Sequence, residues 1–98
     1  MTVVACKLKL HLPMSNSLKA KRQVVRSIVG QVRSRFDVAV AEVGAQDLWQ
    51  ITEIGVACVT SDVSHGHEVI SKVASFVAGL KLGEAELLDY ETEVAELF

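Results

Sequence analysis

The sequence predicts an α+β domain with four strands and two helices in the order β-α-β-β-α-β. Three observations predict this class: alternating apolar residues at the start of the chain, an amphipathic helical pattern directly after them, and further strand, helix and strand patterns in the remainder. The chain has 98 residues, of which 50% are hydrophobic and one is Pro. This length and composition predict one compact domain, residues 1–98.

A strand and a helix are expected in the first third of the chain. Apolar residues recur at every second position over residues 2–12, which is typical of a strand with one buried face. Pro13 ends this strand, and the polar residues at 15–17 are candidate N-caps for a helix that continues to about Arg35. The core stripe of the helix recurs at helical spacing and consists of Leu18, Val25, Ile28, Val29, Val32 and Phe36.

Two strands are expected in the middle of the chain, at residues 36–43 and at about 49–60. The turn-rich segment GAQD separates them. Their core-facing residues alternate with polar or small residues and are Val38, Val40, Ile54, Val56 and Cys58.

A second helix and a last strand complete the order. The helix is expected to begin after Asp62 or Ser64 and to end at Lys81 and Gly83. The strand covers about residues 84–95, with Leu88, Tyr90 and Val94 inward and Asp89, Glu91 and Glu93 outward. Right-handed crossovers then give a ferredoxin-like fold, an antiparallel sheet in the order 4-1-3-2 with both helices on one face.

Charge is distributed unevenly along the chain. Residues 1–36 contain eight of the ten Lys and Arg residues and no acid, although the net charge of the chain is −2. This asymmetry indicates an anionic partner for the first third of the chain. Alternatively, the two halves neutralise each other in the folded protein. Lys7 and Lys9 fit this alternative, because acids of the last strand are expected opposite them.

The first helix has a second stripe beside its core stripe, formed by Lys19, Arg22, Arg26 and Arg33. Cations in its first turns oppose the helix macrodipole, whereas the free N–H groups of that helix end bind anions. Gly30 falls in a gap of the stripe and leaves room for a close approach. The predicted anion site, for RNA phosphates, consists of Ser15, Asn16, Ser17, Lys19, Lys21, Arg22, Arg26 and Arg33. The alternative is a solvated helix face, or one paired with acids elsewhere in the chain.

The open face of the predicted sheet favours contact with protein over stacking of bases. The outward positions of its two central strands carry no aromatic residue, which a base-stacking surface requires. Small and apolar residues on this face predict a homo-oligomer formed through the sheet; they are Ala39, Ala41, Ala57 and Val59. A separate partner contact is expected in the segment before the third strand, at Gln46, Asp47, Trp49 and Gln50. Trp49 could equally close the edge of the core.

No catalytic site is expected, and therefore no enzyme and no cofactor, because no nucleophile, base and oxyanion donors assemble. His65 and His67 do not share a helical face, which disfavours a metal site. Cys6 and Cys58 lack the spacing of a disulfide framework, so we expect buried, reduced thiols in a cytoplasmic protein. No apolar run approaches the roughly 20 residues of a membrane span, and residues 1–12 lack the basic start of a signal peptide.

Four segments carry a family resemblance: SLKAKRQVVRSI, VRSRFDVAVAEVGAQDLWQ, GVACVTSD and LLDYETEV. Together they resemble the YlxP-like family of small bacterial proteins, a domain family of unknown function. The resemblance implies a ferredoxin-like fold and supplies no established catalytic residues. It also implies a role in translation or RNA metabolism, because genes of the family often lie beside those for translation initiation and ribosome maturation factors. Glu53 stands where a basic residue is common in the family, which makes the positive surface less extensive.

Two functions therefore remain open. The first is a non-catalytic RNA- or ribosome-associated accessory protein that binds phosphates through the first helix. The alternative is a self-associating module that binds a protein or a small ligand. A third reading, an enzyme that uses the His65–His67 region, has the least support from the residues.

Overall fold

The secondary-structure elements follow one another in the predicted order. In the computed structural model they are β1 (Thr2–His11), α1 (Leu18–Arg35), β2 (Ala39–Gly44), β3 (Ile51–Thr60), α2 (Val63–Ala78) and β4 (Glu86–Glu96). The structure describes residues 1–81 and 85–98. The predicted start of α2 is confirmed, since the Asp62 carboxylate accepts a hydrogen bond from the Ser64 N–H at 3.0 Å.

The predicted end of α2 is wrong at Lys81. The helix ends at Ala78, and the N–H of its C-cap Gly79 donates to the carbonyl oxygens of Ser75 and Phe76. Gly79 therefore ends the helix. The sequence pattern did not indicate this end, because apolar residues continue past Gly79 at helical spacing. Gly83, the other predicted end, lies outside the described residues.

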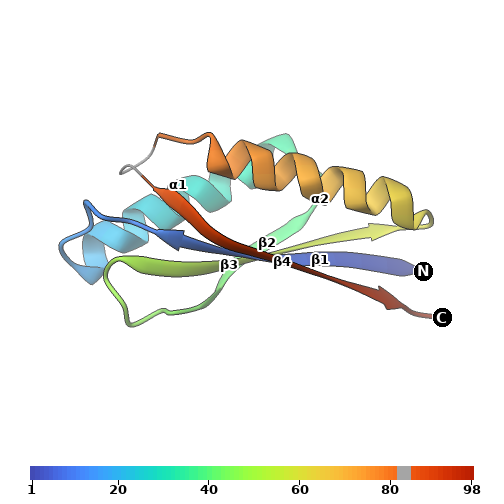
Figure 1. Ribbon diagram of the computed structural model, residues 1–98, viewed down its shortest axis with the longest axis horizontal. Helices are drawn as coiled ribbons and strands as arrows, with labels where there is room; N and C mark the ends of the chain where they lie inside the picture. The colour runs from blue at the N-terminus through green and yellow to red at the C-terminus, as the bar shows by residue number, and fades with distance from the viewer. Residues whose placement is uncertain (82–84) are drawn as a thin grey trace.

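The four strands form one antiparallel sheet in the order β2-β3-β1-β4, which confirms the predicted topology. Both helices lie on the same face of this sheet, and none of the described residues forms a helix on the opposite face (Figure 1). The molecule is elongated, with principal extents of 44 × 22 × 20 Å. The two chain termini lie at one end of its long axis, and the turn between β1 and α1 lies at the other (Figure 1).

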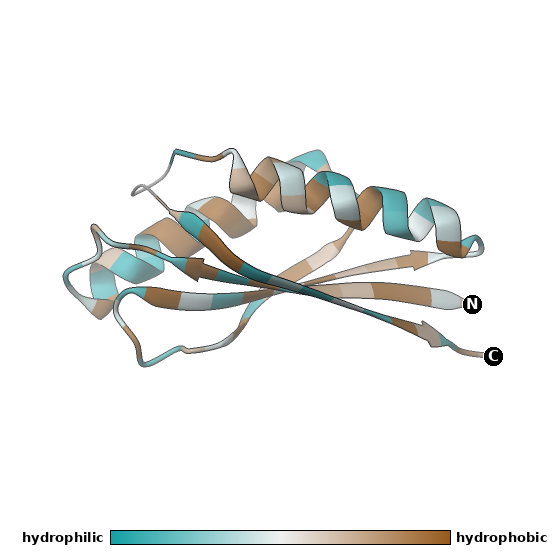
Figure 2. Ribbon diagram, in the orientation of Figure 1, coloured by the Kyte–Doolittle hydropathy of each residue, from teal (hydrophilic) through white to brown (hydrophobic). Residues whose placement is uncertain are grey.

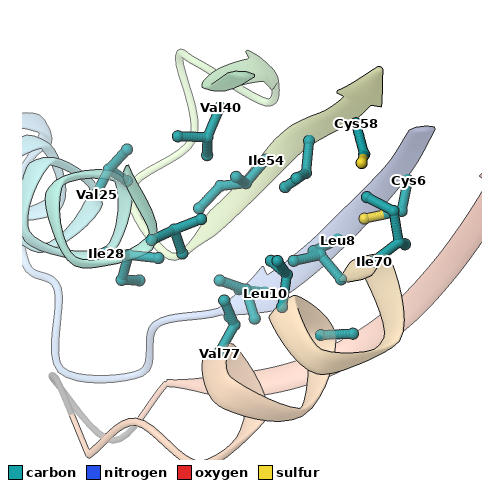
Figure 3. Close-up of a cluster of buried hydrophobic side chains, with 14 of the residues drawn as sticks. Cys6, Leu8, Leu10, Val25, Ile28, Val40, Ile54, Cys58, Ile70 and Val77 are labelled. Carbon is teal, nitrogen blue, oxygen red and sulfur yellow. The ribbon is translucent and has the colours of Figure 1, made fainter. Parts of the chain in front are cut away.

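The core lies between the sheet and the helices (Figure 3). Alternate residues of β1 face it, and Val4, Leu8 and Leu10 are at most 1% exposed. Residues from β2, β3 and both helices complete the core; they include Val40, Ile54, Val56, Val25, Ile28, Val32, Ile70, Val73 and Val77. Burial of each such side chain contributes about 1.5–3 kcal/mol of transfer free energy, so this layer fixes the position of both helices.

The inward position predicted for Leu88 is wrong. The pairing of β1 with β4 shifts register between Lys9 and Leu10, so that Leu87 lies opposite Leu10 and Asp89 opposite Lys9. Leu88 is the extra residue of this bulge and is 51% exposed. The inward residue at this level is Leu87, which packs against the core.

The other two inward residues predicted for β4 lie on the expected face but are only partly covered. Tyr90 pairs with Leu8 and Val94 pairs with Val4. Their exposures are 40% and 43%, because β4 is the edge strand beside β1. Hydrophilic residues are more frequent along β4 than along the central strands β1 and β3 (Figure 2).

Two helical glycines differ in their surroundings. At Gly30 in α1, no neighbouring atom lies within 4 Å of where a Cβ would be, so the close approach considered there is absent among the described residues. At Gly66 in α2, a Cβ would lie 2.6 Å from Cγ2 of Val4 and 3.0 Å from Cγ2 of Thr60. The close contact between helix and sheet is therefore at Gly66, where the missing side chain lets α2 approach β1.

Candidate functional site

The turn before α1 carries three polar residues, and the protein itself buries one of them and hydrogen-bonds another. Ser17 is the N-cap, with φ −164° and ψ 163°, and its hydroxyl accepts a hydrogen bond from the Ala20 N–H at 3.0 Å. Ser15 is 4% exposed. Asn16 is exposed. Of the three polar residues predicted to cradle a phosphate, Asn16 therefore presents its side chain freely, whereas Ser15 is withdrawn from the surface and Ser17 caps the helix.

Lys21 is a buried structural cation and requires a correction of the predicted anion site. It is 1% exposed, and its Nζ lies 3.1 Å from Oε2 of Glu42 on β2. The same Nζ donates a hydrogen bond to the carbonyl oxygen of Ala45. Thr52 on β3 donates from its hydroxyl to Oε2 of Glu42 at 2.7 Å. Because its charge is already compensated inside the protein, Lys21 is not available to a surface phosphate.

Three cations of α1 remain on the surface without a carboxylate partner. Lys19, Arg22 and Arg26 are exposed. Among residues 1–81 and 85–98 none of them forms an ion pair within 4.0 Å. We call these three residues the basic stripe. At a rise of about 1.5 Å per residue the stripe extends along roughly 10 Å of the helix.

The C-terminal half of α1 uses its cations differently. Arg33 is exposed, but its Nη2 donates a hydrogen bond to the Val40 carbonyl oxygen at 3.1 Å. The guanidinium of Arg35 lies 4.7 Å from the centre of the Phe76 ring, which itself packs edge-on against Phe36. Arg33, although predicted for the anion site, is therefore partly engaged in joining α1 to β2.

Lys7 shows the charge neutralisation that the sequence left as an alternative. On the open face its Nζ lies 3.1 Å from Glu53 and 3.4 Å from Glu91. The hydrogen bond and charge of Glu53, followed by those of Glu91, raise the pKa of Lys7 above its ordinary value. Lys9 lies opposite both Glu53 and Asp89 in the sheet register. Neutralisation thus occurs on the sheet and does not extend to the basic stripe.

The connection between β2 and β3, residues 45–50, lies against the start of α1. Gln50 donates from Nε2 to the carbonyl oxygens of Pro13 and Ser15, at 3.2 and 3.3 Å. Its own carbonyl oxygen accepts from the Leu12 N–H at 2.7 Å. Gln50, predicted as a partner contact, therefore has a structural role that joins two segments distant in the sequence.

Residues 46–49 of this connection are exposed. Trp49 is 54% exposed and Leu48 is 52% exposed, so Trp49 does not close the edge of the core. Gln46 and Asp47 are exposed as well. The loop is held in shape by Ala45, whose φ of 58° turns the chain and whose carbonyl oxygen accepts from the Leu48 N–H. An apolar surface thus lies next to the turn that begins α1.

The open sheet face combines small residues with carboxylates. A hollow of about 260 Å³ lies on it, lined among others by Ala5, Val43, Gly55, Glu91 and Glu93. Val43 and Val59 are 56% and 65% exposed. A polyanion would meet repulsion from the carboxylates on this face. This face of the described strands therefore disfavours nucleic acid, in agreement with the lack of outward aromatic residues on β1 and β3.

Groups with catalytic or metal-binding chemistry are dispersed. His65 and His67 are exposed at the start of α2. Within the part of the chain that the structure describes, no three His, Cys, Asp or Glu residues lie close enough to hold a metal ion. Cys6 and Cys58 are free, buried thiols, and burial raises the pKa of Cys6 to about 11.

The Lys21–Glu42–Thr52 network is the feature that sequence reasoning missed. A signal for it was present: Glu42 and Thr52 both occupy positions that the period-2 pattern assigns to the core face. Polar residues at such positions require buried partners, and a lysine in the flanking helix can supply one. The sequence pattern gave no means of choosing Lys21 over its neighbours, because that choice depends on how α1 is rotated above the sheet.

The fold and the basic stripe together define a small ferredoxin-like domain with one exposed cationic helix face. The chain belongs to the family described as "Protein of unknown function (DUF503)", whose model matches residues 3–92. It is 36% identical over 63 residues to the uncharacterised protein YlxP of Bacillus subtilis (strain 168), a match that covers 64% of this chain and 68% of that protein. The family resemblance stated from the sequence is thereby confirmed.

A solved structure shares the fold. It is a C-terminal segment of the alpha subunit of aIF2 from Pyrococcus abyssi, with a TM-score of 0.54 and 14% sequence identity. The match covers 97% of this chain and 51% of the archaeal chain, so this chain corresponds to about half of that segment. At this identity the likeness concerns the fold alone. None of the helices described here is long and apolar enough to cross a membrane.

Proposed function

We propose that this protein is a non-catalytic, cytoplasmic accessory protein that binds RNA, free or within a ribosomal particle, through the phosphate backbone. The observation that carries the proposal is the basic stripe. Lys19, Arg22 and Arg26 are exposed on one face of α1 and form no ion pair with the described residues. Exposed cations without acidic partners are what a phosphate backbone requires.

The charge distribution supports this assignment. The protein has a net charge of −2, yet the stripe belongs to a segment, residues 1–36, that contains no acid. Carboxylates gather instead on the open face of the sheet, where Glu53 and Glu91 flank Lys7. An RNA strand approaching this molecule is attracted to α1 and repelled by the open face of the sheet, so the protein binds with α1 toward the RNA.

The test compares two triple variants with equal charge change. K19E/R22E/R26E reverses the stripe, whereas K9E/K72E/K81E reverses three exposed lysines on β1, on α2 and after α2. We expect the first variant to lose RNA binding and the second to retain most of it, as measured by fluorescence anisotropy with a labelled RNA at low salt. The logarithm of the wild-type affinity should fall with the logarithm of salt concentration with a slope of about −2, for three contacts to single-stranded RNA.

Two outcomes would overturn the proposal. One is a wild-type protein that binds no RNA at low salt, either free or in ribosomal particles collected by sedimentation. The other is equal loss in both triple variants, which would indicate diffuse attraction without a role for α1. Crosslinking of the tagged protein in bacterial lysate, followed by sequencing of the bound RNA, identifies the target.

A second candidate function is self-association through the open sheet face, and one observation favours it. Val43 and Val59 are more than half exposed on this face, next to the small residues Ala39, Ala41 and Ala57. A sheet face of small and apolar residues packs against another sheet at little steric cost. This candidate is compatible with RNA binding, because the basic stripe lies on the other side of the sheet.

A further inference from the structure

We propose that the target of this protein is unpaired RNA, and that one of its bases stacks on the indole of Trp49. This inference rests on the proposed function and specifies its substrate class. The observation behind it is the large aromatic side chain of Trp49, which is 54% exposed. Stacking on aromatic side chains is the usual way in which proteins hold unpaired bases.

The segment that carries Trp49 is attached to the start of α1 at both of its ends. At one end the Ala45 carbonyl oxygen accepts a hydrogen bond from Lys21 of α1. At the other end Gln50 donates to the carbonyl oxygens of Pro13 and Ser15, in the turn that leads into α1. Both segments lie at the end of the molecule remote from the chain termini (Figure 1). The indole is therefore carried by a braced loop, which lowers the ordering cost of binding.

Charge at the end of α1 to which this loop is attached favours a nucleic acid as the occupant. The buried Lys21 that holds the loop is flanked along α1 by the exposed Lys19 and Arg22. A strand with a base on Trp49 would have its sugar-phosphate backbone near these cations, and Arg26 continues them along the helix. An aromatic face beside a row of cations fits the two recurring parts of a nucleotide, the base and the phosphate.

The other aromatic residues are placed less well for this role. Phe36 and Phe76 pack against each other with ring centres 5.7 Å apart. Tyr90 lies on β4, the strand that also carries exposed carboxylates. Phe98 is the last residue of the chain, at the far end of the molecule (Figure 1). Among the described residues, Trp49 is thus the aromatic residue whose loop is attached to the start of α1.

A duplex would not use this site, because its bases are already stacked and paired. Placing one of them on Trp49 would cost a few kcal/mol of unstacking and unpairing. The inference therefore predicts a preference for unpaired over double-stranded RNA, which phosphate contacts alone do not provide.

The experiment uses the fact that Trp49 is the single tryptophan of the chain. The full-length protein is titrated with a short single-stranded RNA and, separately, with the same RNA annealed to its complement. We expect single-stranded RNA to quench the tryptophan fluorescence and the duplex to leave it nearly unchanged. Anisotropy with labelled RNA should show about ten-fold weaker binding for W49A, within the usual range for loss of one stacked base.

Matched variants separate stacking from general damage to the loop. W49F keeps an aromatic face and should retain most of the affinity. L48A removes a neighbouring side chain of similar exposure, 52%, and should bind like the wild type. The inference is overturned if W49A binds single-stranded RNA with wild-type affinity, or if L48A loses as much affinity as W49A.

The remaining outcomes distinguish this inference from the proposed function. Suppose that K19E/R22E/R26E abolishes RNA binding, that W49A binds like the wild type, and that the wild type binds single-stranded and duplex RNA equally well. The stacking inference then fails and the proposed function stands. If the wild-type protein binds neither form of RNA at low salt, the stacking inference fails. If it also does not sediment with ribosomal particles, the proposed function fails as well. Quenching by vesicles of anionic phospholipid in the absence of any quenching by RNA would also overturn the inference, since a membrane surface would then be the occupant.

Discussion

Lys21 joins α1, β2 and the connection at residues 45–50 through a single buried ammonium group. We expect K21M to lower the free energy of unfolding by about 3 kcal/mol, because the Glu42 carboxylate would lose its cation in a largely buried position. Glu42 has a side-chain exposure of 19%, so water compensates part of the loss. Urea denaturation measured at neutral pH would give the change.

A matched variant and a double-mutant cycle test the cause of this loss. R22M removes the next cation along α1, which is exposed, and should change the free energy of unfolding by less than about 0.5 kcal/mol. The double variant K21M/E42Q should recover part of the stability lost in K21M, since it removes the uncompensated charge. Equal destabilisation by K21M and R22M would contradict the assigned role of Lys21.

The Cys6 thiol predicts a dependence of stability on alkaline pH. Burial raises its pKa from 9.0 to about 11 in the folded protein. The unfolded chain therefore loses this proton first. The contribution of the thiol to the free energy of unfolding should be constant below pH 9 and fall as the pH rises from 9 to about 11. Burial, followed by the charge of Cys6, raises the pKa of Tyr90 as well, which contributes in the same direction.

The variant C6A isolates the contribution of the thiol. Its free energy of unfolding should fall less steeply than that of the wild type when urea denaturation is repeated across this pH window. C58A provides the control, because it removes the other buried thiol. Identical slopes for the wild type and C6A would show that Cys6 does not titrate as the structure indicates.

Each helix contains one interior glycine, and the two predict opposite effects of a methyl group. In α2, G66A places a Cβ 2.6 Å from the Val4 side chain, so helix and strand must separate. We expect a loss of about 1–3 kcal/mol in the free energy of unfolding, typical of overpacking. In α1, G30A has open space around the new Cβ and should gain up to about 1 kcal/mol from helix propensity. Thermal unfolding followed by circular dichroism compares the two variants, and destabilisation by G30A or stabilisation by G66A would contradict this account.

The elements themselves were predictable because their signals are local. Alternation in β1, helical spacing in α1 and the Asp62 cap of α2 each depend on residues close in sequence, and all three are observed. Leu88 was assigned wrongly because the bulge opposite Lys9 and Leu10 depends on pairing between the two ends of the chain. The residues around such a register shift do not reveal it in the sequence. The shift moves the neighbouring residue to the opposite face of the sheet.

At the level of the whole molecule, the two faces of the sheet predict two separable interactions. If the open face joins two copies, V59E should shift a dimer toward monomer in analytical ultracentrifugation, because a carboxylate would be buried in an apolar contact. V63E provides a control, since Val63 is exposed at the start of α2 on the helical side. A wild-type protein that remains monomeric at high concentration would exclude this mode of self-association.

Hydrophobic periodicity and chain order specified the strands, the helices, their topology and the basic character of α1, because each follows from spacing along the chain. The candidate site required the tertiary structure, since it depends on which side chains the packing buries. Lys19, Lys21 and Arg22 share one segment and one charge, yet the rotation of α1 against β2 leaves Lys19 and Arg22 exposed and pairs Lys21 with Glu42. The attachment of the Trp49 loop to the turn before that helix likewise results from hydrogen bonds between segments more than 30 residues apart, as for Gln50 with Pro13 at a separation of 37 residues.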